Sequence, residues 1–383
     1  MAKTGSVVAG MLAGADCIDD LDLLRHGGMG RLFDGVRAPS TLGTYLRSFT
    51  HGHVQQLDAV SSRLLAGLAA RVPGLLAGGD QVAFVDVDAT IREVHGYAKQ
   101  AAAFGYSGVR GLNVQLAVVS TPLVAPVIAS ARLRRGNVAS AAGVGRLLAQ
   151  AINTARGAGA TGQIMARAEV VAAISRIEES AWTPISYPHA IWEAEDQRWV
   201  SDAEVAEIDF TAFISRRKAE HVACRLVVRR VKRLNPTAGP SDDTVQGELF
   251  AAHRHHAFIT NSTLATIEAD ARHRDHAIVE QVIAELKDGP IAHLPSSSYT
   301  ANAAWLAHAV IAFNLSRTAG VLACQRHARA RWATIRTHLI NVPARIASSA
   351  RRLTLHLPQA WPWAEAWSTL AEHATGPPAP ATA

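Results

Sequence analysis

The stretch 82–88 (VAFVDVD) constrains the fold more than any other part of the sequence. It is a run of β-branched and aromatic residues of strand length, and it follows a loop at 73–79. Because side chains alternate between the two faces of a strand, Asp86 and Asp88 are expected on the same face. Burying two acids in an apolar strand is costly, so this pattern predicts a sheet whose carboxylates have a specific role.

Two carboxylates that lie close together repel each other unless a cation or a shared proton compensates. Magnesium is a natural partner for Asp86 and Asp88, because it binds oxygen ligands of this kind. The alternative interpretation is the end of a strand whose acids are solvated. The spacing alone supports these two interpretations about equally.

Apolar periodicity and turn residues divide the rest of the chain into elements. Strands are expected at 82–88, 112–120, 164–166, 225–231 and 257–260. Helices are expected within 18–71, at 139–156, at 275–288 and through most of 290–371, followed by a disordered Gly-Pro-Pro-Ala-Pro tail. The polar segment 182–250 is expected to hold one clear strand and to be an insertion.

This order of elements predicts an α/β fold with a mixed sheet flanked by helices. The expected parts are an N-terminal helical region (1–79), a first core segment (80–180), a β-containing insertion (181–255), a second core segment (256–320) and a basic helical C-terminal region (321–383).

Composition favours an anionic partner inside a reducing compartment. The formal net charge is +6, which suits nucleic acid first and an anionic membrane surface second. The three cysteines are far apart, so neither a disulfide framework nor a zinc knuckle is indicated, and a cytoplasmic location is expected. The apolar run 306–321 contains polar residues and is too short to cross a bilayer, so it predicts a buried helix.

The segment 273–287 holds a second set of chemically active side chains. On one helix His273, His276, Glu280, Ala284 and Lys287 would form a largely polar stripe, with a carboxylate between cations. Such a stripe suits metal binding beside phosphate, although the solvated face of a surface helix is the more common explanation. The spacings typical of helical zinc sites are absent, so zinc is not expected.

Basic residues gather in two further segments. From 289 to 363 the chain has no Asp or Glu but carries arginines at 317, 326, 329, 331, 336, 345, 351 and 352. The insertion adds Arg216, Arg217, Lys218 and a second group at 229–233. Either segment could face phosphate, or its cations could pair with acids elsewhere in the chain.

Taken together, these segments resemble the transposases of bacterial insertion sequences in the insertion-sequence-4 superfamily, and within it the insertion-sequence-1380 group. The resemblance extends through nearly the whole chain. The stretches that carry it are 18–29, 86–90 with 95–97, 105–111, the helix around Glu280, 300–305 and 313–317.

The resemblance implies an RNase H-like core in which two aspartates and a glutamate hold two Mg²⁺ or Mn²⁺ ions for attack on DNA phosphate. Asp88 matches the first aspartate, with Asp86 as the second candidate, and Glu280 matches the glutamate. The family's helix carries a tyrosine, an arginine, the glutamate and a lysine, which correspond to His273, His276, Glu280 and Lys287. Histidine thus replaces two of the implied phosphate contacts, and Arg217 and Lys218 are further candidates for contacting DNA.

The sequence departs from the family where the second aspartate is expected. Relatives have a motif like Arg-Ala-Asp-Ser after the third strand, whereas here Arg167-Ala168 is followed by Glu169. About thirty residues, enough for a short element and a strand, are also missing before 172–174. We therefore hypothesise an internally deleted copy that begins partway into the family's helical domain, in which the second ligand is Glu169 or is absent.

The function implied is metal-dependent cleavage and strand transfer at insertion-sequence ends, with the activity of this copy left open. The partners would be the terminal inverted repeats and target DNA, bound in the bacterial cytoplasm at the nucleoid, where a homodimer could form on the DNA, with no membrane involved. Two alternatives remain: a catalytically dead remnant that still binds DNA, and another RNase H-like nuclease that cleaves without joining strands.

Overall fold

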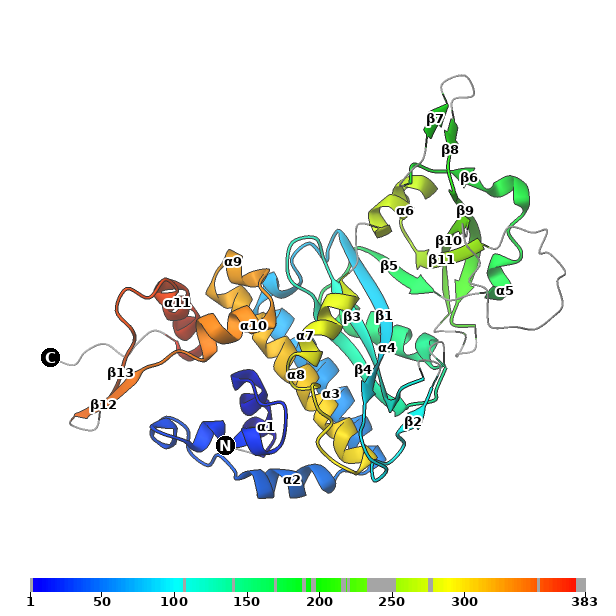
Figure 1. Cartoon of the computed structure of the whole chain (residues 1–383). Helices are drawn as coiled ribbons and strands as arrows, with labels where there is room; N and C mark the ends of the chain where they lie inside the picture. The colour runs from blue at the N-terminus through cyan, green and yellow to red at the C-terminus, as the bar shows by residue number, and fades with distance from the viewer. Residues whose placement is uncertain are drawn as a thin grey trace. The chain divides into compact units, whose positions relative to one another are not determined.

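The structure, a computed structural model, divides into two units. Unit 1 comprises Met1–Gly162 and Ile278–Ala383, and unit 2 comprises Gln163–Ala277. The residues that the structure describes are 3–105, 108–139, 142–168, 171–187, 191–193, 198–214, 218, 221–232, 253–274, 278–349 and 352–376 (Figure 1).

Unit 1 contains an antiparallel arrangement of strands centred on β3. The strands are β1 (Val82–Glu93), β2 (Ala103–Phe104), β3 (Arg110–Ser120) and β4 (Val127–Arg135). β3 pairs with β1 on one side and with β4 and β2 on the other. Residues of β1 on both faces are buried from Val82 to Val87, which explains the continuous apolar run in the sequence.

Helices surround these strands. The longer helices of unit 1 are α1 (Lys3–Ala13), α2 (Pro39–Arg47), α3 (His51–Arg71), α4 (Val144–Gly157), α7 (Val279–Lys287), α8 (Tyr299–Ala323) and α11 (Ala364–Thr375). Shorter helical turns are η1 (Asp19–Arg25), η2 (Met29–Arg31), η3 (Pro73–Leu76), α9 (Gln325–Ala328), α10 (Trp332–Ile335) and the π-helical η6 (Arg336–Ile340). A hairpin of β12 (Arg345–Ser349) and β13 (Arg352–His356) precedes α11.

The largest hydrophobic core of unit 1 forms around α8. Trp305 and Phe313 of this helix are fully buried, and α1, α2 and α3 pack against it. The same core includes Leu116 of β3 and the apolar face of α7. Helix α4 packs against β1, β3 and β4. Helices therefore cover the sheet that contains β1, the strand with both Asp86 and Asp88.

The apolar run at 306–321 lies in α8, as predicted for a buried helix. Within the described residues, α8 has the length and composition that a membrane-crossing helix would need. However, 78% of its most apolar 18-residue stretch is buried in the protein. It also carries the buried polar residues His308, Asn314 and Arg317. A helix buried in a protein core meets the same test, so this composition is weak evidence for a membrane span.

Unit 2 is mostly antiparallel sheet. Its strands are β5 (Gln163–Ala168), β6 (Thr183–Pro184), β7 (Ile191–Glu193), β8 (Arg198–Val200), β9 (Ala203–Ala212), β10 (Val222–Lys232) and β11 (His253–Thr260), and its helical segments are α5 (Val171–Ile174), η4 (Glu179–Ala181) and α6 (Thr266–Arg274). The order β5-β11-β10-β9-β6 is antiparallel at each step, while β7 and β8 form a separate pair. Helix α6 packs against β9 and β10.

The chain has the predicted α/β class, with sheet flanked by helices, but several local predictions were wrong. The segment 182–250 holds β9 as well as the one strand expected there. The C-terminal region is not helical throughout, because β12 and β13 interrupt it. The helix expected at 275–288 begins at Val279 among the described residues. The Gly-Pro-Pro-Ala-Pro tail lies almost entirely outside the described residues, and the RNase H-like detail and the five domain boundaries remain predictions.

Candidate active site

Strand pairing fixes which face of β1 carries the acids. In the antiparallel register Asp86 is opposite Val118 and Asp88 is opposite Leu116. Residues directly opposite each other in an antiparallel pair point to the same face. Val118 and Leu116 belong to the core that also contains the apolar side of α7, so both aspartates lie on the face of the sheet that α7 covers.

The two aspartates differ in exposure. Asp86 is buried, with 6% of its surface exposed, whereas Asp88 lies at the point where β1 becomes half-buried. One carboxylate oxygen of Asp88 accepts a hydrogen bond from the backbone N–H of Ala89 at 2.7 Å, which leaves the other oxygen for a further ligand. The acids are thus part of the sheet and not of a solvated strand end.

Helix α7 brings Glu280 to this side of unit 1. It packs against β1 and β3 through Val282, Ile283 and Leu286. Glu280 is exposed, and Lys287, seven residues later, is half-buried. Seven residues make nearly two helical turns, so Glu280 and Lys287 lie along the same side of the helix, as predicted.

A buried ion pair fixes α7 in place. The carboxylate of Glu285 accepts a hydrogen bond from the Arg317 guanidinium of α8 at 2.8 Å and another from the backbone N–H of Trp332 at 2.6 Å. The loop after α7 is attached to the end of β1, because Arg92 donates to the carbonyl oxygen of Ala292. These contacts determine where Glu280 lies relative to β1, and no local pattern in the sequence predicts them.

The third predicted ligand, Glu169, lies outside the described residues. Within the described residues, the group of at least three His, Cys, Asp or Glu side chains with ligand atoms within 4.8 Å of one another is Asp16, Cys17 and Asp20. Burial raises the pKa of the Cys17 thiol, which disfavours the thiolate that a metal requires. Asp86, Asp88 and Glu280 share one side of unit 1 but do not form such a compact group in the part of the chain that is described.

The predicted polar stripe does not extend to His273. His273 lies on α6 in unit 2, where its ring stacks on Phe258 with ring centroids 4.2 Å apart, whereas α7 belongs to unit 1. His276 and Arg217 lie outside the described residues, and Lys218 is exposed. The failure has a simple reason: side chains share a stripe only when one uninterrupted helix carries them.

Several arginines that were expected to face DNA are used inside the protein. Arg317 is buried against Glu285. In unit 2 Arg229 pairs with the buried Asp270 at 2.8 Å, and Arg230 pairs with Glu179 and Glu204. The alternative interpretation, pairing with acids distant in sequence, is therefore correct for these three residues.

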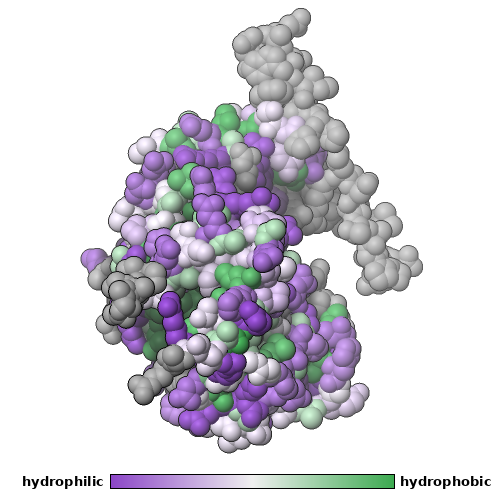
Figure 2. Space-filling view, turned by 90° about the vertical axis from the view of Figure 1, so that its left-hand side faces the viewer, coloured by the Kyte–Doolittle hydropathy of each residue, from purple (hydrophilic) through white to green (hydrophobic). Residues whose placement is uncertain are grey.

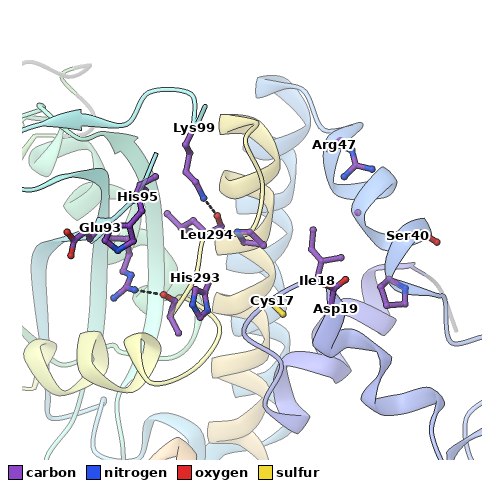
Figure 3. Close-up of a pocket in the computed structure, with 16 residues that line it drawn as sticks. Cys17, Ile18, Asp19, Ser40, Arg47, Glu93, His95, Lys99, His293 and Leu294 are labelled. Atoms are coloured by element: carbon purple, nitrogen blue, oxygen red, sulfur yellow. Dashed lines mark hydrogen bonds between the residues drawn. The ribbon is translucent and has the colours of Figure 1, made fainter. Parts of the chain in front are cut away.

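A cavity of about 790 Å³ lies near the end of β1, and its wall includes the acids Asp19 and Glu93 as well as basic residues (Figure 3). Its wall includes Arg47, His95, Lys99 and His293. Lys99 donates to the carbonyl oxygen of Leu294, and burial lowers its pKa. His293 lies 3.2 Å from a carboxylate oxygen of Asp16. The cavity thus holds basic groups that are already partly engaged, and it does not include Asp86, Asp88 or Glu280.

Comparison with known proteins gives one family match. Residues 249–375 match the family model described as "Transposase DDE domain group 1". A search of the curated proteins found no match. The matched region includes α7 with Glu280 and all of α8, but it does not include β1. The match supports a DDE transposase, an enzyme class that acts on DNA and generally uses divalent metal ions.

Proposed function

We propose that this chain is a transposase of the insertion-sequence-4 superfamily that cleaves and joins DNA at insertion-sequence ends, with an RNase H-like core. The observation that carries the proposal is that Asp86 and Asp88 point to the face of the sheet covered by α7, the helix with Glu280. The family match supports the coarser part of this proposal, a DDE transposase, because it covers α7 independently of the aspartates.

Asp88 and Glu280 would hold the metal, with Asp86 or Glu169 as the additional acid. Carboxylate oxygens are the donors that Mg²⁺ and Mn²⁺ prefer, so the residue types fit these ions. Bound there, the metal would polarise phosphate and activate water or a DNA 3′-hydroxyl. The exposed position of Glu280 and the half-buried position of Asp88 would leave both carboxylates accessible to a DNA backbone.

Within this proposal Lys287 would contact phosphate beside Glu280, and the partners would be terminal inverted repeats and target DNA in the bacterial cytoplasm. A nicking assay tests the metal chemistry directly. The full chain would be incubated with a supercoiled plasmid that carries the DNA flanking its gene, with Mg²⁺, Mn²⁺ or EDTA. We expect nicked and joined products with either metal and none with EDTA.

Two isosteric variants, Asp88→Asn and Glu280→Gln, should each reduce nicking at least a hundredfold, because they remove a charged ligand without changing side-chain volume. Glu365→Gln, at the first turn of α11, is a matched control that should nick like the unmodified chain. Metal-dependent nicking that survives both substitutions would refute the assignment of these ligands.

An unmodified chain that binds DNA but does not nick it would support the alternative, a DNA-binding remnant whose metal site is incomplete. Nicking without strand joining would instead support an RNase H-like nuclease.

A further inference from the structure

The hairpin β12–β13 has two chemically different faces. Its register pairs Arg345 with His356 and Ser349 with Arg352, so these four residues share one face. The alternate positions carry Ile346, Leu353 and Leu355, which lie on the other face together with Ser348. All the basic residues in the described part of the hairpin therefore lie on a single face, which we call the basic face.

The apolar side of the hairpin is attached to the N-terminal region. Ile346 approaches Gly28 so closely that a Cβ on this glycine would lie 2.7 Å from the Ile346 Cδ1 atom. Arg31 donates to the carbonyl oxygen of Ile346 at 3.1 Å. These contacts hold β12 at Ile346, whereas Leu353 and Leu355 on the same side of the hairpin are 42% and 37% exposed.

The basic face is open to solvent. Arg345, Arg352 and His356 are all exposed. No ion pair between these residues and an acid occurs in the described part of the chain, and the sequence has no Asp or Glu between 289 and 363. On the side of the molecule seen in Figure 2, hydrophilic residues cover most of the surface and hydrophobic ones are scattered. The hairpin thus presents uncompensated positive charge.

The spacing of the cations suits duplex DNA. Arg345 and Ser349, the partner of Arg352, are four residues apart, which corresponds to about 13 Å along a strand. The major groove of B-DNA is about 12 Å wide and admits a two-stranded β-ribbon, with phosphates along both rims. The small pair Ala347 and Thr354, which lies between the cations on this face, would let the ribbon approach the groove floor.

We propose that β12–β13 is a DNA-binding ribbon whose basic face lies against the phosphates of a duplex major groove. This inference rests on the proposed function for its partner, but it concerns a surface that has no part in the metal chemistry. Arg345 and Arg352 each contact one phosphate, on opposite rims of the groove.

The test measures the affinity of the full chain for a labelled duplex of about 30 base pairs at several salt concentrations. Binding is detected by fluorescence anisotropy in the presence of EDTA. The variant Arg345→Gln with Arg352→Gln should bind at least about tenfold more weakly at 0.1 M salt. Its slope of log K against log salt should be smaller by about 1.8, since each phosphate contact contributes about 0.9. The control is Arg63→Gln with Arg71→Gln, two exposed arginines of α3, which should leave the slope unchanged.

Three results would overturn the ribbon. They are an unchanged slope in the hairpin variant, no duplex binding by the unmodified chain, and a larger loss of binding to phosphatidylserine vesicles than to duplex. The last would assign the basic face to a membrane surface. Binding is measured without metal, so weaker binding by the variant supports the DNA-binding ribbon even if the chain fails to nick. If the chain nicks DNA but the variant's salt slope is unchanged, the ribbon is refuted and the proposed function stands.

Discussion

The buried ion pair between Glu285 and Arg317 should be one of the most sensitive positions in unit 1. Replacing Arg317 by Met removes the charge and keeps much of the volume. It leaves a carboxylate in a residue that is only 9% exposed, with the Trp332 N–H and the Gln281 amide as its remaining donors. Removing one partner of a buried pair typically costs about 3–5 kcal/mol, so we expect a loss of this size in the free energy of unfolding.

Burial lowers the pKa of Arg317, and the charge of Glu285 opposes that effect. Glu285→Gln combined with Arg317→Met should therefore recover much of the loss, because no unpaired charge stays buried. A double-mutant cycle by urea unfolding would measure the coupling between the two residues.

The matched control is Arg25→Met. Arg25 pairs with Asp22 at 2.5 Å, but their side chains are 43% and 31% exposed, so the expected cost is below about 1 kcal/mol. The reasoning fails if Arg317→Met costs no more than this control, or if the double variant loses as much as the two single variants combined. Glu280 lies on α7, the same helix as Glu285. Nicking should therefore fall along with stability in Arg317→Met and return in the double variant.

Two further predictions concern stability. Burial raises the pKa of Asp58 to about 7, with Arg132 opposing the shift, so the folded state binds this proton more tightly than an unfolded chain with the ordinary value of 3.8. The free energy of unfolding should then fall by about 2–4 kcal/mol as pH rises from about 4 to 8, and Asp58→Asn should flatten that change in urea midpoints; an unaltered pH profile would contradict it. Gly320→Ala would place its Cβ 2.5 Å from the carbonyl oxygen of His327, so we expect a loss of about 1–3 kcal/mol in thermal unfolding, and wild-type stability would show that the backbone yields there.

Strands and helices were predictable where hydrophobic periodicity alone determines them. β1 and β3 are long runs of mostly apolar residues, and α8 is a long helix buried in a core, so the apolar pattern of each sequence reflects its burial. β4 was missed because Arg134 interrupts its apolar pattern. In the fold Arg134 is buried and donates to the Asn113 side-chain oxygen at 3.0 and 2.8 Å. In the sequence, an arginine whose hydrogen-bond partner is a distant amide cannot be told from an exposed arginine.

The same limit explains which site residues were predictable. The alternation at 86–88 gave the shared face of the two aspartates, because strand geometry is local. The identity of Arg317, Arg229 and Arg230 as ion-pair partners depended on tertiary contacts with Glu285, Asp270 and Glu204, which no local pattern encodes. The hairpin did carry a signal: polar and apolar residues alternate from Arg352 to His356, and this period of two distinguishes a strand from the helix that was expected there.

The contrast between Asp86 and Asp88 bears on which of them would bind metal. A residue that binds a metal in contact with DNA must be accessible to water and phosphate. A fully buried carboxylate can only orient such a ligand through hydrogen bonds. Asp86 has 6% of its surface exposed and Asp88 lies further along the same face, where β1 opens toward solvent. We therefore expect Asp88 to contact the metal and Asp86 to support it from within the sheet. On this argument Asp86→Asn would weaken metal affinity and leave residual nicking at high Mg²⁺, whereas Asp88→Asn would abolish nicking at every concentration, and the reverse pattern would exchange the two roles.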